Sequence, residues 1–162
     1  MSRIQARVAL GVLLIIAGLF FLLQSLGIIA LSVSVLSAVF AVAGLVFLSV
    51  FVSDRQNWWT AIPGFTLLGL AALLVLAESG EESAGSLGAA TFLGSIALSF
   101  WLTYLTNREQ WWAVIPGGAI LSVAAVVGLS PIWEGSVLGG VLMLGLGLTF
   151  MLLAFLPIPG GI

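Results

Sequence analysis

Six apolar runs, each about twenty residues long and almost free of charged residues, constrain the fold more than any other feature of this sequence. A helix rises about 1.5 Å per residue, so about twenty residues cross the ~30 Å hydrocarbon core of a bilayer. Only 6% of the 162 residues are charged and 62% are apolar, which leaves too little polar surface for a soluble domain. We therefore predict that lipid is the main solvent of this chain. The expected spans cover residues 8–28, 30–52, 58–77, 87–106, 111–129 and 135–156.

The runs are expected to form helices. They lack the alternation of polar and apolar residues that a membrane β-barrel requires, and an isolated strand would leave backbone groups unpaired in lipid. The connections between runs are short, so successive helices must be antiparallel neighbours. The predicted fold is one all-α polytopic membrane domain of six transmembrane helices in three antiparallel hairpins, over residues 7–53, 58–106 and 111–157.

An internal repeat supports the hairpin plan. The stretch Arg-Gln-Asn-Trp-Trp-Thr-Ala-Ile-Pro-Gly at residues 55–64 returns 53 residues later as Arg-Glu-Gln-Trp-Trp-Ala-Val-Ile-Pro-Gly at residues 108–117. A fixed period indicates that one supersecondary unit has been copied. Gly11 lies a further 53 residues before Gly64, which predicts a third copy, although that copy lacks the Trp-Trp-Pro signature. The even-numbered runs align less well and are expected to need a gap.

The arginines predict the orientation of the chain. Arg3 and Arg7 precede the first run, Arg55 lies between the second and third, and Arg108 lies between the fourth and fifth. All four fall on one side of the membrane, whereas the acidic loop at residues 78–83 falls on the other. The positive-inside rule then places both termini in the cytoplasm. The N-terminus resembles a signal peptide, but a second run follows at once, so we expect an uncleaved first span.

The repeated stretch carries the expected membrane-interface anchors, because arginine and tryptophan gather where a span meets water. These anchors are Arg55, Trp58, Trp59, Arg108, Trp111 and Trp112. Binding of anionic lipid head groups by the two arginines is an alternative role.

Pro63 and Pro116 lie five residues inside spans that begin at the tryptophans. Proline removes one hydrogen bond from a helix, so we expect a slight kink at each.

Small residues spaced four apart let helix backbones approach closely, which favours helix association in lipid. The contacts could lie within the chain or on a homodimer face, and the sequence leaves both open. The predicted packing residues are Ala90, Gly94, Ser95, Ser99, Gly118, Ser122, Gly135 and Gly139.

Residues that carry out chemistry are scarce. Cysteine and histidine are absent and there is no basic patch for nucleic acid, so we expect no catalytic site, metal site or cofactor and no nucleic-acid partner. Glu78, Glu81 and Glu82 could hold a divalent cation, but charge runs are usually solvated. Aromatic residues within the spans could contact a pigment or quinone, and helix packing is the plainer interpretation.

Residues 11–28, with glycine, aliphatic residues, Gly18-Leu19-Phe20 and a closing Leu26-Gly27-Ile28, resemble the transmembrane segments of bacterial LiaI/LiaF-type cell-envelope-stress proteins. Trp58, Trp59, Pro63 and Gly64 are similar to the opening of the following helix in those proteins. The plan of three hairpins is similar to that of HdeD-type six-helix membrane proteins. Neither resemblance implies a catalytic residue.

The leading functional expectation is therefore a non-enzymatic structural or accessory subunit of the bacterial cytoplasmic (inner) membrane. It would bind a partner membrane protein, or copies of itself, through small-residue helix faces. One alternative is a small channel, transporter or lipid-handling protein with a path lined by Ser95, Ser99, Thr103 and Ser122. A further alternative, an envelope-stress modulator, rests on the resemblance alone. Membrane lipid is an expected partner in every case.

Overall fold

The computed structural model describes residues 32–54 and 57–156, together with residues 15, 18, 19, 22 and 26. The chain divides into two compact units, Met1–Ser32 and Val33–Ile162, and the account below concerns the second. The predicted first span, Arg3, Arg7, Gly11 and Arg55 lie outside the described residues, apart from the five isolated positions in that span.

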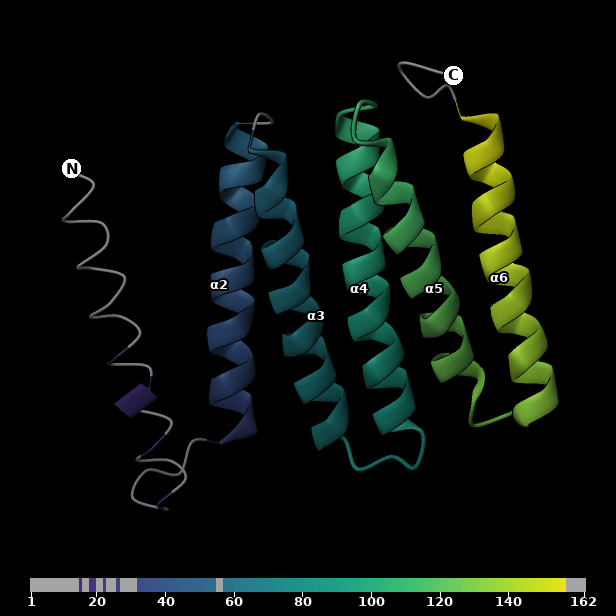
Figure 1. Ribbon diagram of the computed structural model, residues 1–162. Coiled ribbons are helices and arrows are strands. Elements are labelled where there is room, and N and C mark those ends of the chain that lie inside the picture. Colours follow the sequence, from purple (N-terminus) through teal and green to yellow (C-terminus); the bar gives the residue numbers. More distant parts are fainter. Residues whose placement is uncertain are drawn as a thin grey trace. The chain divides into compact units, whose positions relative to one another are not determined.

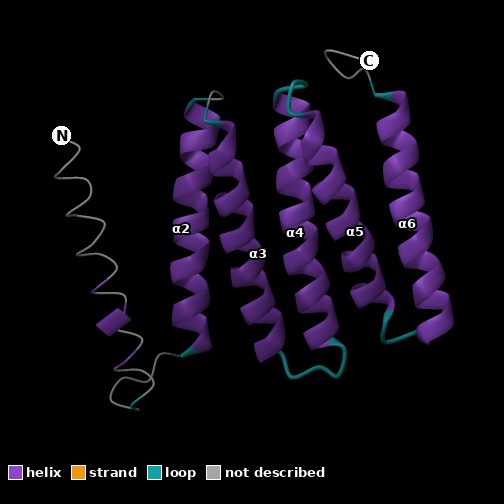
Figure 2. Ribbon diagram, viewed as in Figure 1, coloured by secondary structure: helices purple, strands orange, loops and turns teal. Residues whose placement is uncertain are grey.

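Five antiparallel helices form the described part of this unit, joined at alternating ends (Figures 1 and 2). They are α2 (Val33–Ser53), α3 (Ala61–Glu78), α4 (Ala84–Thr106), α5 (Val114–Leu129) and α6 (Gly135–Phe155). Two short 3-10 turns, η1 (Trp58–Thr60) and η2 (Trp111–Ala113), lead directly into α3 and α5. With these turns included, all five are long and apolar enough to cross a membrane, as expected of a multi-pass membrane protein.

The predicted boundaries of the five spans agree with the structure to within three residues. The largest differences lie at the starts of α2 and α4. Helix α4 begins at Ala84, three residues before the expected start, because its first turn is made of small and polar residues that the apolar pattern does not detect. The Ala84 N–H donates to the Glu81 carbonyl at 2.9 Å, and the Ser86 hydroxyl donates to the Ser83 carbonyl at 2.9 Å.

The helices form a row. Among the five described α-helices, close approach of the backbones occurs only between neighbours in sequence, so α2 packs on α3, α3 on α4, α4 on α5 and α5 on α6. The faces of the middle helices therefore stay open, with large apolar side chains such as Val75, Leu98 and Leu121 at 57%, 54% and 49% exposure. Such a surface suits lipid, which is as apolar as these side chains.

Glycines hold α2 and α3 together. A Cβ added to Gly44 would lie 2.9 Å from the Gly64 carbonyl oxygen and 2.8 Å from Leu68 Cγ, and a Cβ on Gly64 would lie 2.8 Å from Leu48 Cδ2. The backbones can approach so closely only because neither position has a side chain.

The tryptophan turns have nearly the same conformation in both copies. Asn57 has φ −85° and ψ 46°, and Gln110, 53 residues later, has φ −84° and ψ 41°. The carbonyl of each accepts a hydrogen bond at 3.0 Å, from the N–H groups of Thr60 and Ala113 respectively. The two copies of the repeated stretch therefore fold alike.

The helices that precede the two turns also correspond. Helix α2 ends at Ser53 and α4 ends at Thr106, 53 residues later. Phe51 and Tyr104, again 53 residues apart, are buried to 4% and 5% exposure. The gap expected in the alignment of the even-numbered runs is thus not needed at the ends of α2 and α4. The third copy of the repeat stays a prediction, because its first hairpin is not fully described.

Pro63 and Pro116 each occupy the third position of an α-helix, since α3 begins at Ala61 and α5 at Val114. Proline is tolerated in a first turn, where its missing N–H would have no partner within the helix. The structure has a change from 3-10 to α geometry before each proline, and the kink stays a prediction.

Candidate functional site

The two tryptophan turns meet each other and form an aromatic cluster with α4. Trp58 and Trp112 pack edge to face with ring centroids 6.2 Å apart, and Phe100 packs on Trp112 in the same manner at 6.2 Å. The Trp112 indole Nε1 also donates to the Gln110 side-chain oxygen at 2.6 Å. Edge-to-face pairs bring the positive ring edge against the negative face of the neighbour, so this cluster joins the ends of two hairpins.

Arg108 lies beside this cluster. Its guanidinium carbon is 4.6 Å from the centroid of the Tyr104 ring, an arrangement that gives a cation–π attraction. Arg108 is itself exposed, so its charge remains available to water or to a lipid head group. Tyr104 is buried with Ala113 and Val114 in the small apolar core at this end of the helices.

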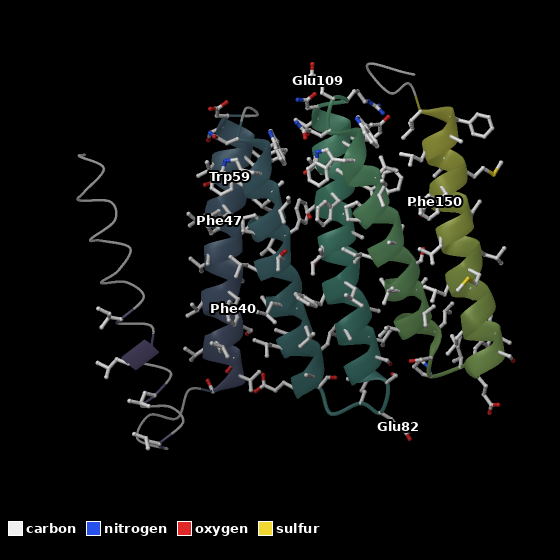
Figure 3. The ribbon with its side chains drawn as sticks, in the orientation of Figure 1. Phe40, Phe47, Trp59, Glu82, Glu109 and Phe150 are labelled. Atoms are coloured by element: carbon white, nitrogen blue, oxygen red, sulfur yellow. The ribbon has the colours of Figure 1, made fainter. Side chains whose placement is uncertain are left out.

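The two ends of the helices differ in charge. Arg108, the only basic residue in the described part of the chain, lies at the end with the tryptophan turns, and the loops at the opposite end carry only acidic charges. Trp59 and Glu109 lie at the end that holds the tryptophan turns, and Glu82 lies at the opposite end (Figure 3). At that opposite end a polar hollow of about 570 Å³ is lined by Glu82, Ser83, Ser86, Ser130 and Pro131. Within residues 32–54 and 57–156, no three histidine, cysteine or acidic side chains come close enough to hold a metal ion.

Four predicted packing residues lie where neighbouring helices cross. A Cβ on Gly118 of α5 would lie 2.8 Å from Thr149 Cβ of α6, and a Cβ on Gly145 of α6 would lie 2.7 Å from Ser122 Cβ of α5. These reciprocal contacts interlock the two helices. Two further crossings pair Ser95 with Gly69, between α4 and α3, and Ala90 with Gly128, between α4 and α5.

The other four predicted packing residues divide into two kinds. Ser99 is fully buried in α4. Gly94, Gly135 and Gly139 face open space, because an added Cβ at any of them would meet no described atom outside its own helix within 4 Å.

The serine and threonine hydroxyls of α4 and α5 bond within their own helices. The Ser95, Ser99 and Thr103 hydroxyls donate to the carbonyls of Phe92, Ile96 and Ser99 at 2.7, 2.6 and 2.9 Å. Ser99 and Thr103 are both 0% exposed. Ser99 and Thr103 therefore face neighbouring helices in this structure, whereas Ser95 is partly exposed. Ser122 is also buried, at 5% exposure.

Trp101 of α4 packs over Gly117 of α5, where an added Cβ would lie 3.3 Å from the Trp101 Cδ1 atom. Its indole Nε1 is buried and has no hydrogen-bond partner in the described part of the chain.

Several residues that hold the helices together were not anticipated from the sequence. Gly44, Gly69, Gly145 and Thr149 each meet a partner on a neighbouring helix. Gly145 and Thr149 are four apart, so the spacing that selected Gly118 and Ser122 could also have selected them. That spacing could not have paired them across the crossing.

Comparison with protein-family models, with curated proteins and with solved structures finds no match for this chain.

Proposed function

We propose that this protein is a non-enzymatic structural or accessory subunit of a bacterial cytoplasmic membrane, and that it binds a partner membrane protein or a second copy of itself through α6. The observation that carries this proposal is the contrast between α6 and the other helices. In the described part of the chain Thr149 is the only buried residue of α6, whereas each of the other four α-helices has at least three.

The glycines of α6 support the same proposal. The Ser122 side chain of α5 packs on Gly145, whereas no described atom outside α6 lies within 4 Å of a Cβ added at Gly135, Gly139, Gly140 or Gly147. Elsewhere, at Gly44, Gly64 and Gly69, glycine marks a close approach to a neighbouring helix. A glycine face open to lipid gains little packing from flexible chains, but a rigid helix can approach it closely.

Replacing Gly139 with leucine should weaken association of the full-length protein in detergent or in bilayers, because the new side chain would hold a partner helix away. We expect the apparent dissociation constant to rise about tenfold, which corresponds to ~1.4 kcal/mol. Native mass spectrometry after gentle extraction, together with dilution-dependent energy transfer between labelled copies, measures this change.

The matched control is Gly85 of α4 replaced with leucine, because Gly85 also faces open space but lies on another helix. This control should associate like the wild-type protein. A wild-type chain that is monomeric and captures no membrane partner would contradict the proposal. Equal behaviour of the two variants would contradict the assignment to α6.

We further propose that the end with the tryptophan turns faces the cytoplasm, with both termini on that side. Exposed Arg108 and the adjacent aromatic cluster support this orientation, because arginine is enriched on the cytoplasmic side. The chain has no cysteine, so single cysteines report sidedness directly. In intact cells, Ser79→Cys should react with a membrane-impermeant maleimide, and Glu109→Cys should react only after permeabilisation. The opposite pattern would overturn the orientation.

A transport path through Ser95, Ser99 and Thr103 has less support, since their hydroxyls are bonded within α4. An envelope-stress role is supported only by the resemblance of residues 11–28. Equal fluxes of ions and small solutes in loaded and empty liposomes would remove the transport alternative.

A further inference from the structure

An apolar groove of about 440 Å³ runs between α5 and α6, with Trp101 of α4 on its wall. Its lining includes the small residues Gly118, Ser122, Ala125 and Gly145 together with Leu121, Leu144, Leu148 and Leu152. Along α6 the lining extends from Val141 to Leu152, which is about 16 Å at the helical rise per residue. The volume is within the ~300–1,000 Å³ typical of ligand sites.

The groove forms because small residues lie where α5 and α6 cross. Ser122 packs directly on Gly145, and Thr149 packs directly on Gly118. The two backbones therefore come close, and no bulky side chain occupies the space beside the crossing. The surrounding leucines remain exposed, with Leu144 at 69% and Leu148 at 60%. The result is a groove along the helix pair with leucine side chains on both sides.

The chemistry of the lining selects a hydrocarbon occupant. The groove has no charged residue in its lining. The Ser122 and Thr149 hydroxyls each donate at 2.8 Å to the carbonyl of their own helix, at Gly118 and Gly145 respectively. The unpartnered Trp101 Nε1 is itself buried and does not reach the groove surface. No donor in the lining is therefore free to recognise a polar solute, and contact with the occupant comes from dispersion.

The same crossing argues against a protein helix as the occupant. A third helix would approach closely at small residues spaced four apart. Side chains of the α5–α6 pair already pack on Gly118 and Gly145. A third helix would therefore contact the leucines that border the groove. A flexible chain can follow the hollow between those leucines.

We propose that this groove binds one acyl chain of a membrane phospholipid, held for longer than the surrounding bilayer lipid. The site is separate from the open glycine face of α6, so it does not depend on the partner binding proposed above. The acyl chain is retained if its dispersion contacts with the groove are better than those it makes with surrounding lipid chains.

The test uses the full chain in liposomes of phosphatidylethanolamine and phosphatidylglycerol, doped with a phospholipid that carries a diazirine halfway along one acyl chain. After irradiation, peptide mass spectrometry locates the label. We expect preferential labelling of Leu121, Leu144 and Leu148, saturating at one chain per protein. Leu98 of α4, which is 54% exposed, reports labelling by bulk lipid.

Filling the groove with a larger side chain should remove the preferential labelling of the groove residues. Ala125→Phe and, independently, Leu148→Phe place a ring in the hollow from exposed positions. Each should lower labelling at Leu121 and Leu144 about tenfold, a change equivalent to ~1.4 kcal/mol of lost packing. The control Ala119→Phe fills a separate groove, lined also by Leu93 and Leu142, and should leave the preference unchanged. Unchanged labelling at Leu98 shows that each variant is still inserted.

Labelling of Leu121, Leu144 and Leu148 no stronger than that of Leu98 would overturn the proposal, because it would mean ordinary bilayer contact. Labelling that persists in both filled variants would overturn it as well. The absence of label from the groove while Leu98 is labelled would show that protein occupies it, which also overturns the proposal.

Discussion

Replacing Gly44 with leucine should separate α2 from α3 and lower the free energy of unfolding by about 3 kcal/mol, at the upper end of typical overpacking costs. The reason is that the obstacle includes backbone. An added Cβ at Gly44 would lie 2.9 Å from the Gly64 carbonyl oxygen, and a backbone atom cannot move aside as a flexible side chain can. Reversible unfolding in mixed micelles, titrated with a denaturing detergent, measures the change.

Gly85 of α4 offers the matched control, because a Cβ there would meet no described atom outside its own helix within 4 Å. Gly85→Leu should change the free energy of unfolding by no more than about 0.5 kcal/mol, as expected for a surface substitution. Similar effects from the two variants would show that Gly44 does not lie at a close crossing.

Replacing Gly145 with alanine should destabilise the α5–α6 pair by about 2 kcal/mol, because the methyl group would collide with the Ser122 side chain. Removing that side chain should rescue the variant. In Gly145→Ala/Ser122→Gly the nearest remaining atom is Ser122 Cα at 3.4 Å, which is an ordinary contact. A double-mutant cycle should therefore give a favourable coupling of about 1–2 kcal/mol.

Ser95 supplies the control for this cycle. It packs on Gly69 at the α3–α4 crossing and has the same chemistry as Ser122. The effects of Gly145→Ala and Ser95→Gly should add to within about 0.5 kcal/mol, because the two sites share no partner. Equal coupling in both cycles would mean that the rescue is not specific to the α5–α6 crossing.

The local features of this protein were predictable because they depend on short stretches of sequence. The length of each apolar run set the five described spans, since a helix must cover the hydrocarbon core. The 3-10 form of the tryptophan turns was not predicted, although the same residue pattern gives nearly the same backbone angles at Asn57 and Gln110. Proline at the third helical position agrees with that geometry.

The candidate site was predictable only in part. The sequence placed Trp58 and Trp112 at the same end of the helices, but their edge-to-face contact joins turns 53 residues apart. Arg108 was expected near the interface, whereas its position over the Tyr104 ring depends on the rotation of α4.

By itself the sequence determined the number and limits of the described spans and their antiparallel order. Only the tertiary structure decided the 3-10 form of the tryptophan turns, which glycines meet a neighbour, that α6 has a single buried residue, and where the groove lies. The physical reason is lipid. In water, a polar face tells which side of a helix is buried, but in a bilayer both the buried and the exposed faces are apolar. Gly139 and Gly145 are therefore alike in sequence, and only the packing of α5 distinguishes them.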